Sequence, residues 1–369
     1  MSPQTALIVT LIENALIGAV FLLYPRITRK GLLFGVYVGE ETFDGETARA
    51  ITRSWYRRMC AALAASVLLG AGLALWSSEP FAIVVPVNLL VVAFLGLYLW
   101  AYRRARALAP AGPPPAAVAP LVVTPGGGAV LPLLAIAVGL ACGVFSLAHS
   151  WVHYPELPDS VPTHFGISGE PDAWRHKSLA TVMMLPAMVL VMGVGLGGIA
   201  WFTAHAKRAL RRSSRPHSLA AQLRFRAAMT RFLTVVALLA TAMLTTLSIN
   251  VVRVGLGRAT GLGKGQMILT GVLLVYALGG TIYLALRYGQ GGARLEAADA
   301  AAPLTNGLAD NRNWVLGMFY VNRDDPSFLV ERRFGLGYTI NLGNPKAVVL
   351  FGLFLAAIIG LAIVGVVSN

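Results

Sequence analysis

The chain has 369 residues, of which 56% are hydrophobic and only 12% are charged, and its mean hydropathy is +0.68. Soluble globular proteins have about 45–50% apolar and about 25% charged residues, so this composition excludes an ordinary soluble protein and indicates a membrane protein. The formal charge of +14 arises from short basic runs beside apolar segments, a pattern that predicts the lipid bilayer, and no nucleic acid, as the partner.

A transmembrane helix needs about 20 mainly apolar residues, because each residue rises about 1.5 Å and the backbone must satisfy its own hydrogen bonds. Eight segments of the chain meet this requirement. The expected fold is therefore an all-α polytopic membrane protein, with a small β-meander inserted before the last helix. The predicted spans cover residues 5–23, 59–76, 81–102, 130–150, 179–203, 232–252, 266–286 and 347–367.

Most of the 30 Lys and Arg residues lie in the loops after the first, third, fifth and seventh spans. Basic residues accumulate on the cytoplasmic side of membrane proteins. We therefore expect a multi-pass protein of the bacterial cytoplasmic (inner) membrane with both termini outside, an outer loop at residues 151–178 and a cytoplasmic loop at residues 207–226.

A stretch rich in Pro, Ala and Gly follows the third span and predicts a linker, since it cannot continue a helix. It separates a front part of three spans from a rear part of five. The predicted parts are residues 1–108 (front membrane part), 109–129 (linker), 130–252 (rear membrane part with the outer loop), 253–287 (seventh span region), 308–346 (small cytoplasmic β-rich domain) and 347–369 (last span).

Two polar features lie within the predicted spans. Glu13, followed by Asn14, lies near the middle of the first span, where an ionised carboxylate costs about 3 kcal/mol. It is either a proton- or cation-linked site or a neutral packing residue. The sixth span carries a stripe of hydroxyl side chains that fits either the lining of a polar cavity or hydrogen bonding between helices. This threonine stripe consists of Thr230, Thr234, Thr241, Thr245 and Ser248.

Glycines four residues apart occur in the fourth and fifth predicted spans. Gly139 is followed by Gly143, and Gly193 by Gly197. Small residues at this spacing let two helix backbones approach closely in a membrane. We expect them to mark a tight helix crossing.

The outer loop between the fourth and fifth spans is turn-rich, because its prolines and glycines do not permit a long helix. It is also acidic in an otherwise basic protein, which favours a cationic peptide or protein as a partner. We expect His164, Asp172 and Trp174 to form one cluster, with Trp174 at the membrane interface beside the fifth span.

The pieces Leu-Pro-Asp, Val-Pro-x-His-Phe and Gly-x-Pro-Asp-x-Trp, which run from residue 157 to an apolar span, resemble a bacterial membrane domain of unknown function, number 1648. Immunity proteins of the SdpI type are similar in placing this motif between two spans. The resemblance implies protection against a secreted toxin and signalling of its presence. It singles out Leu157, Pro158, Pro162, His164, Phe165, Gly169, Asp172, Trp174 and Lys177.

The cytoplasmic segment 314–345 resembles a second small domain of unknown function, number 5808. The runs 315–321, 328–332 and 338–342 are β-prone and separated by turn residues, which predicts a three-stranded meander. So few residues cannot bury a core alone, so the segment should dock on the helices or on a cytoplasmic regulator. The segment FGVYVGEE (34–41) also resembles a stretch that follows the first span in longer relatives.

Catalytic motifs are not evident, and the sequence predicts no cofactor and no enzymatic activity. His149 and His153 are one helical turn apart, with His164 beyond them, so three imidazoles are candidate zinc ligands; Ser150, however, occupies the place of the zincin glutamate. The sequence thus predicts a non-enzymatic protein that senses a ligand or confers immunity at the cell envelope through the outer loop. The alternatives are a transporter of a small solute or ion that uses Glu13 and the threonine stripe, and a membrane metalloenzyme.

Overall fold

The structure is a computed structural model that describes residues 3–76, 81–112, 130–166, 168–206, 215–295, 309–333 and 335–367. These residues include eight helices long and apolar enough to cross a membrane, so the chain is an α-helical multi-pass membrane protein, as predicted. Each predicted span lies within one of them. They are α1 (Pro3–Ile27), α3 (Glu46–Trp76), α4 (Phe81–Arg106), α5 (Val130–His153), α6 (Leu179–Ala204), α7 (Arg215–Gly255), α8 (Lys264–Tyr288) and α9 (Pro345–Val367).

The helices extend beyond the apolar segments that predicted them. Helix α3 begins 13 residues before the predicted second span, and α7 has 41 residues. At 1.5 Å per residue α7 is about 60 Å long, twice the thickness of the hydrocarbon layer. The loop predicted at residues 207–226 is partly wrong, because the chain is helical from Arg215 onward. The linker predicted at residues 109–129 lies outside the described residues from residue 113.

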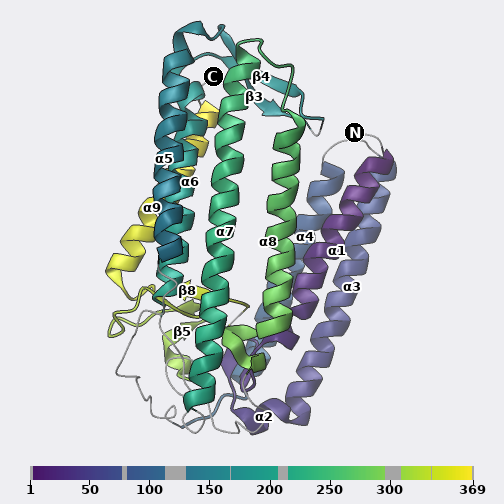
Figure 1. The fold of residues 1–369 in the computed structure, drawn as a ribbon. Coiled ribbons are helices and arrows are strands. Elements are labelled where there is room, and N and C mark those ends of the chain that lie inside the picture. The colour runs from purple at the N-terminus through teal and green to yellow at the C-terminus, as the bar shows by residue number, and fades with distance from the viewer. Residues whose placement is uncertain are drawn as a thin grey trace.

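Two groups of helices form the molecule (Figure 1). The front group consists of α1, α3 and α4, and the rear group of α5, α6 and α7, with α8 against α7 and α9 against α6. A hairpin of β3 (Ser160–Phe165) and β4 (Pro171–His176) lies at the end where α1 begins and α9 finishes. We call this the hairpin end. The opposite end, the insert end, holds the strands that precede α9.

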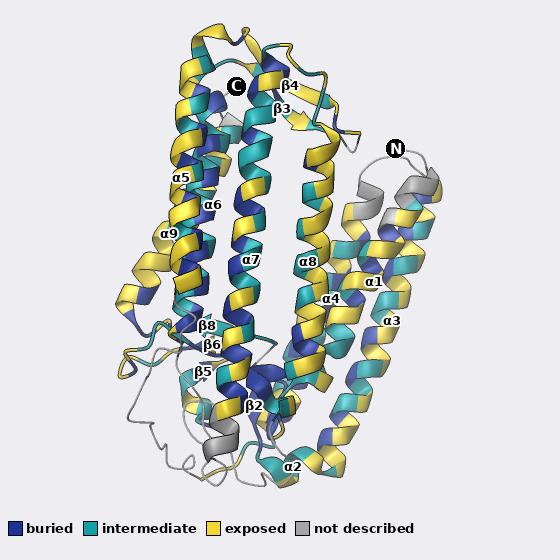
Figure 2. Ribbon diagram, in the orientation of Figure 1, coloured by how far each residue is buried: buried dark blue, intermediate teal, exposed yellow. Residues whose placement is uncertain are grey.

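Many residues on the outer surface of the helices are exposed (Figure 2), and a large number of them are apolar. Leu68, Val275 and Leu353 are 73%, 73% and 65% exposed. Such surface is unfavourable in water and suits lipid chains. The buried side chains of the front group gather near the insert end around Trp55, which packs against Phe34 and Phe94.

Glycines bring α5 and α6 into direct backbone contact, as their spacing predicted. A Cβ atom placed on Gly139 would lie 2.5 Å from the carbonyl carbon of Gly193, and one on Gly143 would lie 2.6 Å from Cα of Leu190. The hydroxyl oxygen Oγ1 of Thr241 on α7 also packs at Gly193, at 3.1 Å from the position of a Cβ atom there. The crossing of α5 and α6 is thus held by small residues, with α7 packed onto it.

The two polar features of the spans lie in different helix groups. Asn14 is buried, and its Oδ1 lies 2.5 Å from Oγ of Ser66 on α3, which is also 2.8 Å from the carbonyl oxygen of Pro86 on α4. Asn14 therefore links the front helices, beside the half-buried Glu13. The threonine stripe lies on α7 in the rear group, where Thr234 and Thr245 donate hydrogen bonds to carbonyls of their own helix. This separation does not favour the transporter interpretation, which needs both features at one cavity.

The β-rich insert differs from the predicted three-stranded meander. Its described residues form four short strands in two hairpins, joined by a parallel bridge between Tyr320 and Asn341. Residues 315–321 were expected to form a single strand, but Leu316 and Gly317 have φ angles of 52° and 68° and turn the chain back on itself. The strands are β5 (Trp314–Val315), β6 (Phe319–Tyr320), β7 (Leu329–Glu331) and β8 (Tyr338–Ile340).

A matching small hairpin follows α1 and meets the insert. It consists of β1 (Leu32–Leu33) and β2 (Val36–Tyr37), and its turn at Phe34 and Gly35 also has positive φ angles. The hydroxyl of Tyr98 on α4 lies 3.3 Å from the carbonyl oxygen of Phe34 and 2.8 Å from that of Leu316. Gly35 and Gly317 face each other so closely that a Cβ on either would clash with the other backbone. The two turns are therefore packed tip to tip.

The insert also contains buried charges that face the front group. The side chains of Arg29, which follows α1, and Glu331 on β7 are 0% and 5% exposed and form an ion pair of 3.2 Å. Burial lowers the pKa of Arg333 to about 9, and its guanidinium donates to Oδ1 of Asn311 at 2.7 Å and to the carbonyl of Gly35 at 3.2 Å. Arg333 therefore remains charged at neutral pH. The insert docks on the helices, which is one of the two alternatives that its small size predicted.

The insert contacts the rear group through aromatic rings. The ring of Phe328 stacks on Phe202 of α6 with the centroids 5.1 Å apart. Tyr338 lies against Phe225 of α7 at 6.3 Å. The insert thus touches both helix groups and joins them at one end of the molecule.

Candidate functional site

The outer loop expected from the sequence is an antiparallel hairpin. Strands β3 and β4 pair from Ser160 opposite His176 to Phe165 opposite Pro171, with irregular register near His164. Proline lacks the N–H that a sheet interior needs, so it fits the isolated two-stranded pair in which Pro162 and Pro171 occur. Gly169, with φ of 82°, closes the tip. The turn residues therefore shape a defined hairpin rather than an irregular loop.

The base of the hairpin is fixed to the helices by residues on both sides. Leu157 and Val161 are buried against Val182 of α6. Lys177 donates a hydrogen bond of 2.6 Å from Nζ to the carbonyl of Leu157, and its ammonium lies 5.0 Å from the ring centre of Tyr154. These contacts explain why the motif contains Leu157 and Lys177, whose roles here are structural.

The tip of the hairpin rests on the turn between α7 and α8. The backbone N–H of Leu262 donates to the carbonyl of Gly169 at 2.7 Å, and Gly261 approaches the same carbonyl. Arg258 from this turn forms an exposed ion pair of 3.0 Å with Glu156. The hairpin, which connects α5 to α6, is therefore also held by the turn that follows α7.

One face of the hairpin is open to solvent. Asp172, Trp174 and His176 alternate along β4 and are all exposed, with Trp174 48% exposed. Nδ1 of His164 on β3 lies 2.5 Å from Oδ1 of Asp172, and both side chains are more than half exposed. The hairpin thus presents an imidazole–carboxylate pair and an indole ring, each on a backbone held by the contacts described above.

A cavity of about 120 Å³ lies beneath the hairpin, between α5, α6 and α7. Hydroxyl groups of Ser150, Thr163, Thr181 and Ser248 contribute to its walls, and Phe165 and Pro162 of the motif cover it. Oγ of Ser248 is buried without a hydrogen-bond partner among the described residues. Most of the remaining lining is apolar, so these hydroxyl groups are the polar part of the cavity. The sequence pointed to Ser248 through the threonine stripe, but gave no signal for Ser150 or Thr181.

The three histidines proposed as zinc ligands do not come together. His149 and His153 lie on one face of α5 with ring centres 4.5 Å apart, and Nδ1 of His153 is 2.9 Å from the carbonyl of His149. His164 pairs with Asp172 instead. Among the described residues, no group of three or more His, Cys, Asp and Glu side chains is arranged to hold a metal ion. The metalloenzyme interpretation therefore lacks a ligand set in the described part of the chain.

The nine residues singled out by the motif divide into two sets. His164, Asp172, Trp174 and Pro158 are exposed, whereas Leu157, Pro162 and Gly169 are buried and Phe165 and Lys177 are partly buried. Of the exposed residues, His164, Asp172 and Trp174 carry side chains suited to polar or aromatic recognition. The second set holds the hairpin in place.

Two regions of the chain match known protein families. Residues 143–190, which span the half of α5 nearer the hairpin end, the hairpin and the start of α6, match the model of a domain of unknown function, DUF1648. Residues 323–348 of the insert match the model of a family of unknown function, DUF5808. Neither the comparison with curated proteins nor the comparison with solved structures gives a match. The chain is thus a multi-pass membrane protein with one region similar to DUF1648 and a second region similar to DUF5808.

Proposed function

We propose that this protein is a non-enzymatic sensing or immunity protein of the cell envelope, and that the exposed face of the β3–β4 hairpin meets its ligand. The observation that carries the proposal is the His164–Asp172 pair beside Trp174, exposed on a hairpin that is anchored at its base and tip. Binding residues commonly occur on loops positioned by a rigid scaffold. The resemblance to immunity proteins of the SdpI type supports the same role.

A cationic peptide or protein suits this surface. Asp159, Glu170 and Asp172 are all exposed on or beside the hairpin, and Glu156 is only partly neutralised by its exposed pair with Arg258. Carboxylates attract basic side chains, and the exposed Trp174 adds apolar area and a cation–π acceptor. The ligand in this proposal is therefore a basic, amphipathic peptide.

Binding of a synthetic amphipathic peptide of lysine and leucine tests this proposal. In nanodiscs, Glu170→Gln with Asp172→Asn should weaken binding about three- to tenfold, since each exposed charge pair contributes up to about 1 kcal/mol. Fluorescence anisotropy of the labelled peptide measures the affinity. Glu41→Gln with Asp324→Asn removes the same two charges at the insert end and should leave the affinity unchanged. Equal weakening by both double variants would show that the peptide responds to net charge alone and would contradict the proposal.

The orientation in this proposal places the hairpin end outside the cell and the insert end in the cytoplasm, because the basic loops lie at the insert end. The insert is then available to a cytoplasmic regulator. The proposed location is the bacterial cytoplasmic membrane.

Cysteine labelling tests the orientation. In a background with Cys60→Ala and Cys142→Ala, Ser168→Cys at the hairpin tip should react with a membrane-impermeant maleimide in intact cells. Asp324→Cys, which replaces an exposed residue of the insert, should react only after the membrane is permeabilised. The reverse pattern would place the hairpin in the cytoplasm and overturn the proposed function.

A further inference from the structure

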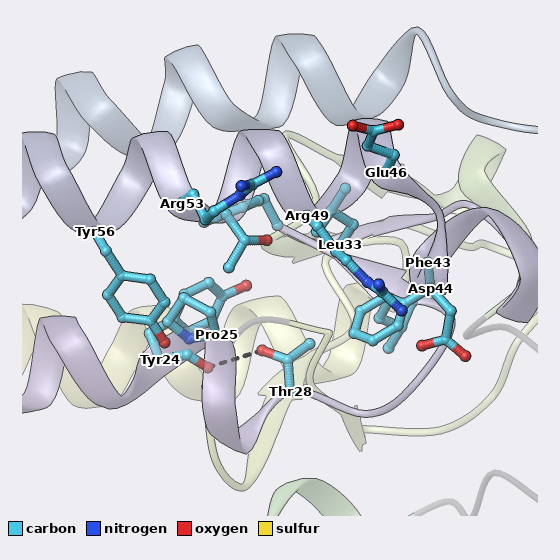
Figure 3. A pocket seen from close by; sticks show the side chains of 13 residues that line it. Tyr24, Pro25, Thr28, Leu33, Phe43, Asp44, Glu46, Arg49, Arg53 and Tyr56 are labelled. Atoms are coloured by element: carbon cyan, nitrogen blue, oxygen red, sulfur yellow. Dashed lines mark hydrogen bonds between the residues drawn. The ribbon is translucent and has the colours of Figure 1, made fainter.

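A second, larger pocket lies at the insert end of the front group, at the opposite end of the molecule from the hairpin (Figure 1). Figure 3 shows the pocket from close by. It has a volume of about 770 Å³, which is in the range of ligand sites. The end of α1, strand β1, the short helix α2 (Glu40–Asp44) and the beginning of α3 form its walls. Helices α1 and α3 form the outer edge of the molecule, so the pocket lies at this edge (Figure 1).

The side chains that line the pocket change in character along its length. Tyr56 lies at one end, Asp44 and Glu46 lie at the other, and Arg53 and Arg49 lie between them (Figure 3). No ion pair or hydrogen bond joins either guanidinium to another side chain in the described part of the chain, and both residues are exposed. The pocket therefore offers two unpaired cations between an aromatic end and an acidic end.

The acidic end retains one carboxylate without a cation. Asp44 is paired with Lys30, whose Nζ lies 2.6 Å from Oδ2 of Asp44. Glu46 begins α3 and is exposed, with no ion pair to a described residue. A positively charged group that extended past the arginines would find Glu46 as its partner.

The pocket begins at the depth of the lipid headgroups and extends toward the water. The apolar part of α1 ends at Leu23, just before Tyr24, and the apolar part of α3 begins at Met59, just after Tyr56. Tyrosine favours the boundary between hydrocarbon and water. Arg53 and Arg49 are three and seven residues farther from the membrane than Tyr56, or about 4.5 and 10 Å along the helix. The headgroup layer of one leaflet is about 5–7 Å thick, so, measured from Tyr56, Arg53 lies within it and Arg49 lies on its water side.

We propose that this pocket binds the headgroup of an aminophospholipid, such as phosphatidylethanolamine. The phosphate lies between Arg53 and Arg49, the ammonium group reaches Glu46, and the acyl chains lie along the apolar parts of α1 and α3. Guanidinium groups bind phosphate oxygens through charge-assisted hydrogen bonds. The order apolar, cationic, anionic along the pocket matches the order acyl chain, phosphate, ammonium along the lipid.

The order of charges also separates this lipid from other phosphate compounds. Phosphatidylglycerol carries the same phosphate but has no ammonium to meet Glu46. Inorganic phosphate has neither the ammonium nor the acyl chains. In this proposal the two arginines bind the phosphate of any phospholipid, and Glu46 gives the preference for a headgroup with an ammonium group.

Thermal unfolding of the purified full-length protein in detergent, with each lipid added in turn, tests the proposal. Phosphatidylethanolamine should raise the melting temperature more than phosphatidylglycerol, and inorganic phosphate should leave it unchanged. Arg49→Gln with Arg53→Gln should weaken phosphatidylethanolamine binding, counted by native mass spectrometry, by about tenfold or more. Glu46→Gln should keep phospholipid binding but remove the preference for phosphatidylethanolamine.

The matched control is Arg57→Gln with Arg104→Gln, which removes two exposed arginines from the same end of α3 and α4 without touching the pocket. It should bind phosphatidylethanolamine as the wild-type protein does. Equal stabilisation of the wild-type protein by phosphatidylethanolamine and phosphatidylglycerol would overturn the headgroup assignment. Equal binding by the pocket variant and the control, or stabilisation by inorganic phosphate alone, would overturn the site.

Discussion

Replacing Glu331 by Ala is expected to lower the free energy of unfolding by about 3–5 kcal/mol, because it removes one charge of a buried ion pair. The partner is Arg29, whose side chain is 0% exposed and lies 3.2 Å from the Glu331 carboxylate. Arg29 also donates to the carbonyl of Gly291 at 3.0 Å. That hydrogen bond does not neutralise the charge. Chemical unfolding in mixed micelles, followed by tryptophan fluorescence, measures the loss.

An exposed ion pair in the same protein provides the control. Glu156→Ala removes the pair with Arg258, in which both side chains are about half exposed, and should cost less than about 1 kcal/mol. The double variant Arg29→Met with Glu331→Leu removes both charges of this pair and should be more stable than Glu331→Ala alone, since apolar residues of similar volume often replace a buried ion pair without loss of stability. A loss after Glu331→Ala no larger than that after Glu156→Ala would contradict a buried ion pair at this junction.

Replacing Gly139 by Val should lower the free energy of unfolding by about 1–3 kcal/mol through overpacking. The Cβ of any larger residue there would lie 2.5 Å from the backbone of Gly193, which cannot move aside as a flexible side chain can. Helices α5 and α6 must then separate, and Thr241 of α7 packs on the same crossing. The melting temperature in detergent measures the change.

Gly279 of α8 serves as the control because a Cβ built on it meets no atom within 4 Å. Gly279→Val should therefore leave the melting temperature nearly unchanged. Gly139→Ala should show a smaller loss than Gly139→Val, in proportion to the added side chain. If both valine variants unfold at the wild-type temperature, the close crossing of α5 and α6 is wrong.

The membrane spans were predictable because the requirement for a span is local. About 20 apolar residues suffice, and each of the eight predicted segments lies within one helix of the structure. The glycine spacing of α5 and α6 predicted close packing for the same reason, since Gly139 and Gly143 lie on one face of a helix. Properties that depend on a short stretch of sequence were therefore accessible.

The hairpin was only partly predictable. The prolines and glycines predicted a turn-rich loop, but the pairing of Ser160 with His176 depends on contacts at the base and tip, such as the hydrogen bond from Leu262 to Gly169. The proximity of His164 and Asp172 follows from that pairing. The hydroxyl groups of Ser150 and Thr181 come from different helices, and no spacing in the sequence indicates that they share a cavity.

The buried ion pair of the insert could not be predicted from sequence for a related reason. Arg29 is one of many arginines beside a span, and such residues usually remain in water at the membrane surface. Glu331 lies in a β-prone run whose short strands depend on docking. Nothing local distinguishes these two residues from exposed charges. Their partnership requires the arrangement of both helix groups around the insert.

The separation of Arg29 and Glu331 along the chain has a consequence for biosynthesis. About 300 residues lie between them, and at about 5–20 residues per second the ribosome takes about 15–60 s to add Glu331 after Arg29. The front helices are therefore inserted long before the insert exists, and until then Arg29 must stay hydrated at the membrane surface. Burial of Arg29 and the joining of the two helix groups become possible only when the chain is nearly complete, which makes this junction one of the last steps in the assembly of the protein.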